Sequence, residues 1–227
     1  MSKHRIVLLH ATPVAMEPIR NAFLQRWPEA EMVNLLDDGL TIDRAKDAEL
    51  TPSLIERFVD FGRYAHRIGA DGILVTCSAF GTAIDRMAAE LPVPVLKPNE
   101  AMFRTALKYG RNVGMLATFA PSVMTMTDEF DLFVKETGTT ARVDTIVVDG
   151  AMDRLRAGDV EGHNNRIAAR AAEFKDHDVI MLAHFSTSRA QAAVEQMVEV
   201  PVLSAPGAAV EQMRRMVTGA AGRDEVK

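Results

Sequence analysis

Short runs of apolar, often β-branched residues alternate along the chain with longer stretches whose apolar positions recur every three or four residues. The short runs include residues 6–9, 32–36, 72–75 and 143–148. Runs of four to eight such residues are typical of buried strands, and their alternation with helical patterns is typical of parallel-sheet architecture. The pattern therefore predicts an α/β fold.

Two of the predicted helices have marked ends. Residues 18–27 begin with a proline and are followed by Pro28. A second helix is expected from residue 51 to about residue 68, just before Gly69, with Thr51 or Ser53 as its N-cap. Its core-facing stripe is predicted to consist of Leu54, Phe58, Phe61 and Ala65.

Other segments have weaker patterns. Residues 40–50 are polar and charged without clear periodicity, which indicates a loop, either over the active site or as a plain surface connection. Residues 219–227 are expected to fray. Methionines at helical spacing are expected to fill the core; four examples are Met124, Met126, Met213 and Met216.

The sequence contains an internal repeat. Residues 71–96 align without a gap with residues 178–203, which lie 107 positions further on, and both segments end in Val-Pro-Val-Leu. The same offset relates the first strands of the two copies, with a slip of one residue expected where residues 10–13 correspond to residues 117–121. We therefore expect two similar parallel-sheet α/β domains. The first domain would contain residues 1–97 and 206–227, and the second residues 98–205.

Cys77 is the only cysteine, and it follows the apolar run 72–75 where a helical pattern begins. Unpaired backbone N–H groups at a helix start favour a thiolate, so the pKa of Cys77 is expected to fall and its sulfur to become reactive. Free cysteines are also among the most buried residues, so an inert core position fits the pattern too.

The repeat places His184 at the position equivalent to Cys77. If the two halves meet at a cleft, the thiol and the imidazole would approach a bound ligand from opposite sides. A hydrogen-bonded histidine at the mouth of a strand is the alternative interpretation.

Composition and motifs exclude several classes of protein. The net charge of −5 is dispersed without a basic block, which argues against nucleic acid, and no apolar stretch approaches the roughly 20 residues of a membrane span. A single cysteine cannot form an internal disulfide and fits a reducing compartment, so a cytoplasmic location is expected. Neither a dinucleotide fingerprint nor a P-loop occurs, and the histidines lack metal-ligand spacing, so neither a nucleotide cofactor nor a metal is predicted. The segment around Cys77 lacks the glycines of a nucleophile elbow, which disfavours a hydrolase.

The sequence Ile-Leu-Val-Thr-Cys-Ser-Ala-Phe-Gly at residues 73–81, the two Val-Pro-Val-Leu motifs and the doubled α/β pattern resemble the aspartate/glutamate/hydantoin racemase superfamily. This superfamily also includes maleate isomerases and arylmalonate decarboxylases. The resemblance implies two pseudo-symmetric domains, an active site between them and no cofactor. In the racemases each half supplies a cysteine, one removing a proton next to a carboxylate or carbonyl and the other donating one. By that pattern Cys77 is the first-half cysteine, whereas His184 replaces the second.

Three functions are compatible with this replacement. The first is a racemase or isomerase of a small carboxylic acid, amino acid or hydantoin-like compound, in which Cys77 and His184 exchange protons with the substrate. The second is a cofactor-free decarboxylase of a malonate-type acid that uses one cysteine. The third is a protein that binds or senses a small acid without converting it.

A small carboxylate or ureide would need donors around it, and the ends of the predicted strands carry several. The candidate substrate-binding residues are His10, Thr12, Thr76, Ser78, Ala79, Asn99, Thr118, Ser186 and Thr187. The hydroxyls and Asn99 could instead cap helices. Three aromatic residues near the same strand ends, Phe80, Phe119 and Phe185, would select an apolar substituent or belong to the core. Many enzymes of this size are homodimers, although the sequence does not decide the oligomeric state.

Overall fold

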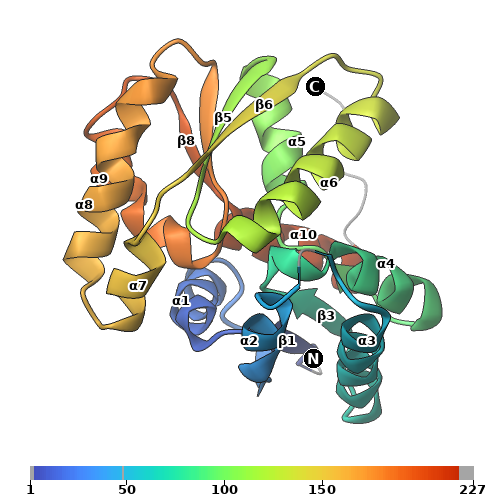
Figure 1. Cartoon of the computed structure of the whole chain (residues 1–227). Coiled ribbons are helices and arrows are strands. Elements are labelled where there is room, and N and C mark those ends of the chain that lie inside the picture. The colour runs from blue at the N-terminus through green and yellow to red at the C-terminus, as the bar shows by residue number, and fades with distance from the viewer. Residues whose placement is uncertain (1–2, 48, 220–227) are drawn as a thin grey trace. The chain divides into compact units, whose positions relative to one another are not determined.

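The computed structural model describes residues 3–47 and 49–219 (Figure 1). The chain divides into two compact units. The first consists of the described residues of Met1–Pro98 and Gly207–Lys227, and the second of Asn99–Pro206. Most of the tail that was expected to fray lies outside the described residues.

The first unit is built on a parallel sheet with the strand order β2-β1-β3-β4. Its strands are β1 (Arg5–His10), β2 (Glu31–Leu36), β3 (Gly72–Val75) and β4 (Val95–Leu96). All of β3 and all of β1 except Arg5 are buried, which explains why both are continuous apolar runs, whereas the edge strand β2 is partly exposed. The predicted α/β class is confirmed.

Helices cover both sides of this sheet. They are η1 (Pro13–Ala15), α1 (Met16–Arg26), α2 (Gly39–Arg44), α3 (Pro52–Arg67), η2 (Ser78–Phe80), α4 (Gly81–Glu90) and α10 (Ala205–Thr218). On one side α3 packs against α4, and a Cβ atom at Gly62 would lie 2.7 Å from Met87 Cγ, so this glycine permits the close approach. On the other side α10 covers β3, where a Cβ atom at Gly72 would lie 2.6 Å from Met213 Sδ.

The second unit has a parallel sheet of the same form, with the order β6-β5-β7-β8. Its strands are β5 (Asn112–Ala117), β6 (Arg142–Val147), β7 (Val179–Leu182) and β8 (Val202–Ser204). Its helices are α5 (Glu100–Tyr109), η3 (Ala120–Ser122), α6 (Val123–Glu136), α7 (Ala151–Arg156), α8 (Val160–Ala171), η4 (Ala172–Phe174), η5 (Ser186–Ala190) and α9 (Gln191–Glu195). Within this unit α8 and α9 lie on one side of the sheet and α5 and α6 on the other (Figure 1).

The pairings of the first and third strands of the two units are related by one constant offset. Ile6 pairs with Gly72 in the first unit and Val113 with Val179 in the second, so each residue of these pairs is followed by its counterpart 107 positions later. The offset also holds from Pro13–Ala15 to Ala120–Ser122. The internal repeat is therefore confirmed, and the expected slip of one residue after the first strand is wrong.

The long predicted helix is confirmed as α3. Thr51 is its N-cap and accepts a hydrogen bond from the Leu54 backbone N–H at 3.3 Å, so Thr51 rather than Ser53 caps it. Leu54, Phe58 and Ala65 are buried as expected, while Phe61 is half-buried.

Two sequence-based expectations are wrong. Residues 40–50 are not all loop, because Gly39–Arg44 form α2 and bury Leu40, Thr41 and Arg44. Of the four methionines named above, Met126 and Met213 are buried, but Met124 and Met216 are 56% and 41% exposed. Helical spacing alone does not distinguish buried methionines from exposed ones.

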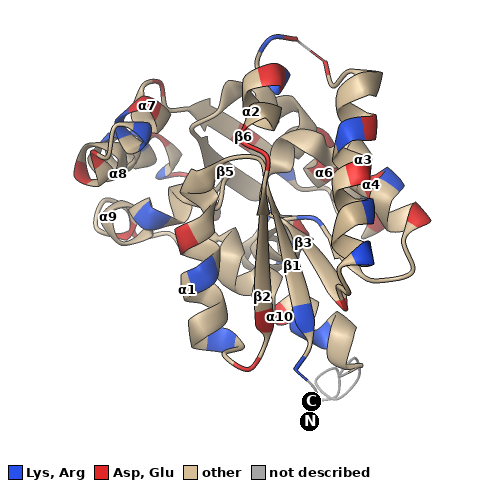
Figure 2. Ribbon diagram, turned by 90° about the horizontal axis from the view of Figure 1, so that it is seen from below, with Lys and Arg blue, Asp and Glu red and all other residues tan. Residues whose placement is uncertain are grey.

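Charged residues of both signs are interspersed on the helices and at the ends of strands (Figure 2). The densest network of ion pairs links α3 and α4, where Arg63 pairs with Glu56, Asp60 and Glu90. Within the described part of the chain, no helix is both long enough and apolar enough to span a membrane.

Candidate active site

Cys77 lies two residues beyond the end of β3 and is half-buried. Burial raises the pKa of the Cys77 thiol to about 11, and the backbone N–H of Ala79 and the charge of Arg44 only partly oppose this effect. The expectation of a lowered pKa is therefore wrong, because the cost of desolvating a thiolate outweighs the two favourable groups. At neutral pH Cys77 is a thiol, which can donate a proton.

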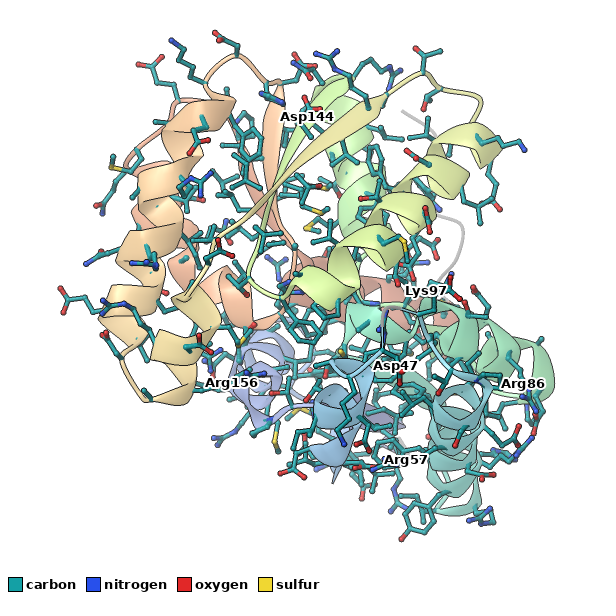
Figure 3. All side chains as sticks on the ribbon, in the orientation of Figure 1. Asp47, Arg57, Arg86, Lys97, Asp144 and Arg156 are labelled. Atoms are coloured by element: carbon teal, nitrogen blue, oxygen red, sulfur yellow. The ribbon has the colours of Figure 1, made fainter. Side chains whose placement is uncertain are left out.

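Arg44 is the residue near Cys77 that sequence reasoning missed. Its side chain is only 1% exposed, and its Nη1 donates to the backbone carbonyl of Asp47 at 2.7 Å; Asp47 is labelled in Figure 3. A buried guanidinium carries its charge in a medium of low dielectric, where it acts strongly on its neighbours. The usable signal was the four-residue spacing between Leu40 and Arg44, which places both on one side of a helix.

Hydrogen bonds link α2, which carries Arg44, and the residues just before it to neighbouring elements. The Thr41 hydroxyl donates to the carbonyl of Ala11, just after β1, at 2.9 Å. On the exposed side, Arg57 of α3 bonds Asp37 at 2.6 Å and Asp43 at 2.7 Å; Arg57 is labelled in Figure 3. The segment that carries Arg44 is thus linked both to the residue after β1 and to α3.

His10, at the end of β1, is fully buried and joins two neighbouring strand ends. Its Nδ1 lies 2.8 Å from Thr76 Oγ1, and its Nε2 lies 2.9 Å from Asn34 Oδ1. Burial lowers the pKa of His10, although the bond to Asn34 opposes this, so the ring is uncharged at neutral pH. Both ring nitrogens already have partners, and the network orients Thr76, the residue next to Cys77.

The other first-unit candidates lie at the same strand ends. Thr12 is the N-cap residue of η1, but its side chain makes no capping hydrogen bond. Ser78 and Ala79 are buried in η2, directly after Cys77. The capping alternative therefore does not apply to Thr12.

His184 lies two residues beyond the end of β7, so the common register places it at the strand position equivalent to that of Cys77. Burial lowers the pKa of His184 to about 4, and the nearby His163 adds to the effect. Its Nε2 lies 3.5 Å from the hydroxyl of Ser122, which donates to the carbonyl of Phe119 at 2.8 Å. At neutral pH His184 is an uncharged imidazole, which can accept a proton.

His163 on α8 is a second missed residue, because the sequence showed it only as one of several scattered histidines. It is fully buried, and its Nδ1 lies 2.8 Å from Asn164 Oδ1. Burial lowers its pKa, Asn164 opposes the shift, and the charge of Arg189 adds to it. Its Nε2 is buried and has no hydrogen-bond partner.

The remaining second-unit candidates are buried polar residues. Ser186 is buried. The hydroxyls of Thr118 and Thr187 and both amide atoms of Asn99 are also buried, and these four atoms have no hydrogen-bond partner. Buried polar atoms without partners are uncommon in folded proteins. Phe80 and Phe185 are buried and Phe119 is half-buried.

Each unit thus presents one group able to transfer a proton, surrounded by polar side chains at the carboxyl ends of its strands. The first unit joins His10 to Thr76, and the second brings Ser122 near His184. Among the described residues, no group of three or more His, Cys, Asp and Glu residues is arranged to hold a metal ion.

Several solved structures share this fold. Glutamate racemase from Thermus thermophilus in complex with β-chloro-D-alanine is 17% identical, with a TM-score of 0.76, over 99% of this chain and 85% of that chain. Allantoin racemase from Pseudomonas fluorescens is 16% identical, with a TM-score of 0.69, over 99% of this chain and 95% of that chain. A liganded mutant of arylmalonate decarboxylase is 19% identical, with a TM-score of 0.62, over 96% of this chain and 94% of that chain.

A search of curated protein sequences found no match. The family model described as Asp/Glu/Hydantoin racemase matches residues 31–213, which include both strand ends described above. The chain therefore belongs to the Asp/Glu/hydantoin racemase family.

Proposed function

We propose that this protein is a cofactor-independent isomerase that moves a proton on a carbon next to a carbonyl or carboxylate group. Its substrate is a small carboxylic acid, amino acid or hydantoin-like compound. The observation that carries the proposal is the pair of protonation states at the two equivalent strand ends, an acid at Cys77 and a base at His184. Proton transfer to and from one carbon requires one of each.

The reaction follows from these states. His184 removes a proton from the substrate carbon and becomes an imidazolium, which leaves the electron pair on the substrate as an enolate. Cys77 then gives its proton to the same carbon and becomes a thiolate. Backbone N–H groups of η2 and the hydroxyls near both strand ends stabilise the enolate oxygen, as donors in an oxyanion hole do. The buried charge of Arg44 favours the thiolate that forms.

The two protonation states also give the reaction a direction. After one conversion, Cys77 is ionised and His184 is charged, although their pKa values of about 11 and 4 favour the reverse. The charged state is therefore less stable than the resting one. The resting enzyme is therefore ready for only one of two enantiomers, and its protons must be exchanged with water before the next conversion.

A decarboxylase of malonate-type acids is the second candidate, and the raised pKa of Cys77 favours it specifically. Loss of carbon dioxide leaves a carbanion on the substrate, and a thiol that remains protonated near neutral pH can supply the proton it needs. This reaction uses Cys77 and does not require a base at His184. The fold shared with arylmalonate decarboxylase is compatible with it.

Proton NMR in D₂O tests both candidates on a panel of aspartate, glutamate, hydantoins, maleate and aryl- and alkylmalonates. The isomerase predicts deuterium at the α-carbon or cis-trans conversion without loss of carbon dioxide. The decarboxylase predicts loss of one carboxylate. Either activity must disappear in Cys77→Ser; turnover that persists in this variant contradicts both. The free thiol that the reaction needs also fits the proposed cytoplasmic location.

A further inference from the structure

Asn99 combines burial with an absence of partners in a way that packing does not explain. It is the N-cap residue of α5, yet its side chain makes no capping hydrogen bond. The side chain is fully buried, and neither Oδ1 nor Nδ2 has a hydrogen-bond partner. An amide that neither caps its helix nor bonds a neighbour has its full donor and acceptor capacity available to a ligand.

The backbone at Asn99 is nevertheless fixed. Its carbonyl accepts from the Phe103 backbone N–H at 3.0 Å, which closes the first turn of α5. α5 packs against β7 and β8 within the second unit. Because helices in parallel α/β units run antiparallel to the strands, its first turn lies at the carboxyl edge of the sheet, where ligands bind in such folds.

The same edge carries further polar atoms without partners. Thr118 directly follows β5, and Thr187 lies in η5 after β7; both hydroxyls are buried and unpartnered. His184 lies at this edge too, after β7. Asn99 is therefore one of several buried polar groups at the same sheet edge as the proposed base.

We propose that Asn99 determines substrate specificity by binding a group that presents an N–H donor beside a C=O acceptor, as an amide, imide or ureide does. The Nδ2 group donates to the ligand carbonyl, and Oδ1 accepts from the ligand N–H. In a free amino acid the N–H donors of the ammonium group are separated from the carboxylate by the α-carbon, so they do not form the coplanar donor–acceptor pair that matches an amide. Asn99 thus favours a cyclic amide or ureide over a free amino acid. That such a ligand is also converted rests on the proposed function.

Binding measurements test the inference independently of turnover. The probes are 5-methylhydantoin and 5-benzylhydantoin, their 1,3-dimethyl derivatives, which lack the ring N–H donors, and alanine and phenylalanine. Dissociation constants are measured by calorimetry on the wild type, Asn99→Leu and Asn99→Asp. The control is Thr145→Val, which also removes a buried, unpartnered polar atom but lies within β6, away from the strand ends.

We expect the wild type to bind at least one hydantoin more tightly than the matching amino acid. Asn99→Leu and Asn99→Asp should weaken hydantoin binding at least tenfold, and Thr145→Val should leave it unchanged. N-methylation of the ligand should weaken binding to the wild type but cause no additional loss in Asn99→Leu, because the same hydrogen bond is already absent. Circular dichroism and thermal melting confirm that each variant is folded.

Equal hydantoin affinity in the wild type and Asn99→Leu overturns the inference, and so does a wild type that binds only the amino acids or none of the probes. Deuterium exchange of the bound hydantoin is measured separately. Binding that depends on Asn99 without exchange contradicts the proposed reaction but not the specificity. Exchange of amino acids that is unaffected by Asn99→Leu contradicts the specificity but not the reaction.

Discussion

The two units share a backbone plan but differ in the chemistry at their strand ends. The third strand of each pairs with the first in the same register, and the next two residues lead to Cys77 in one unit and His184 in the other. Burial acts on both side chains in the direction of the neutral form: it raises the pKa of the thiol and lowers that of the imidazole. The same physical effect therefore makes one end an acid and the other a base.

The neighbours of these two groups differ as well. Cys77 has the buried cation of Arg44 and the network of His10, whereas His184 has His163 and the hydroxyl of Ser122. A cation favours a thiolate, and it would disfavour an imidazolium. The charge of Arg44 therefore favours the thiolate that Cys77 forms, whereas burial and His163 favour the uncharged imidazole of His184, the form that accepts a proton.

The largest expected effect on activity comes from replacing Cys77 and His184 one at a time. Cys77→Ser should lower turnover by about 10³-fold or more, because a hydroxyl is a far weaker acid than a thiol. His184→Gln should lower isomerisation by about 10²-fold or more. Both are measured as kcat/KM on the substrate found by NMR. Decarboxylation that stays within about tenfold of wild type in His184→Gln would contradict a role for the base and assign the reaction to Cys77 alone.

The next largest effect on activity should come from His184→Cys, which places a cysteine at both equivalent strand ends. In wild type, the pKa values of His184 and Cys77 predict activity that is constant between about pH 5 and 10, with limbs near 4 and 11. In His184→Cys the base must first ionise, so the acid limb should rise by several pH units and activity at pH 7 should fall. A pH profile of kcat/KM shows this shift. An acid limb that stays near pH 4 in the variant would exclude His184 as the group that sets it.

The repeat explains why so much of this architecture was predictable from sequence. An offset of 107 positions transfers the first, third and fourth strands of one half to the other, and the Val-Pro-Val-Leu motifs anchor the alignment. The equivalence of Cys77 and His184 followed from this offset alone. A wrong slip was nevertheless introduced by aligning Pro13 with Pro121, because one shared proline outweighed the backbone periodicity.

Electrostatics could not be predicted in the same way. The prediction of a lowered pKa for Cys77 rests on the local helix start alone, whereas burial of the thiol raises this pKa. Arg44 was missed because a charged residue in a polar segment looks exposed, although it is only 1% exposed. Asn34 of β2 and Ser122 of η3 approach their histidines from other elements, and sequence spacing carries no information on such contacts.

Stability at acidic pH should depend on the three histidines whose pKa values burial lowers, His10 in the first unit and His163 and His184 in the second. The unfolded chain binds a proton at each near pH 6.5, whereas folded His184 does so only near pH 4. Unfolding is therefore favoured as pH falls through this range, and stability is fully present above it. His184 alone should account for up to about 3 kcal/mol. Thermal melting of wild type and His184→Gln between pH 7 and 4 measures this, and parallel curves would contradict it.

The smallest expected difference, in melting temperature, concerns the two aspartates that directly precede β3 and β7. Asp71 Oδ2 accepts one backbone hydrogen bond, from Arg5 N at 2.7 Å. Asp178, its counterpart in the repeat, accepts two, from Arg111 N at 2.7 Å and Asn112 N at 2.8 Å, and these bonds hold the pKa of Asp178 below its usual range. Asp178→Asn should therefore lower the melting temperature more than Asp71→Asn, and its effect should vanish as the wild-type carboxylate is protonated at low pH. Both side chains are exposed to solvent, so each change should be modest. Equal shifts in the two variants would mean that the extra hydrogen bond contributes nothing measurable, and that the second unit is not held more firmly at this end than the first.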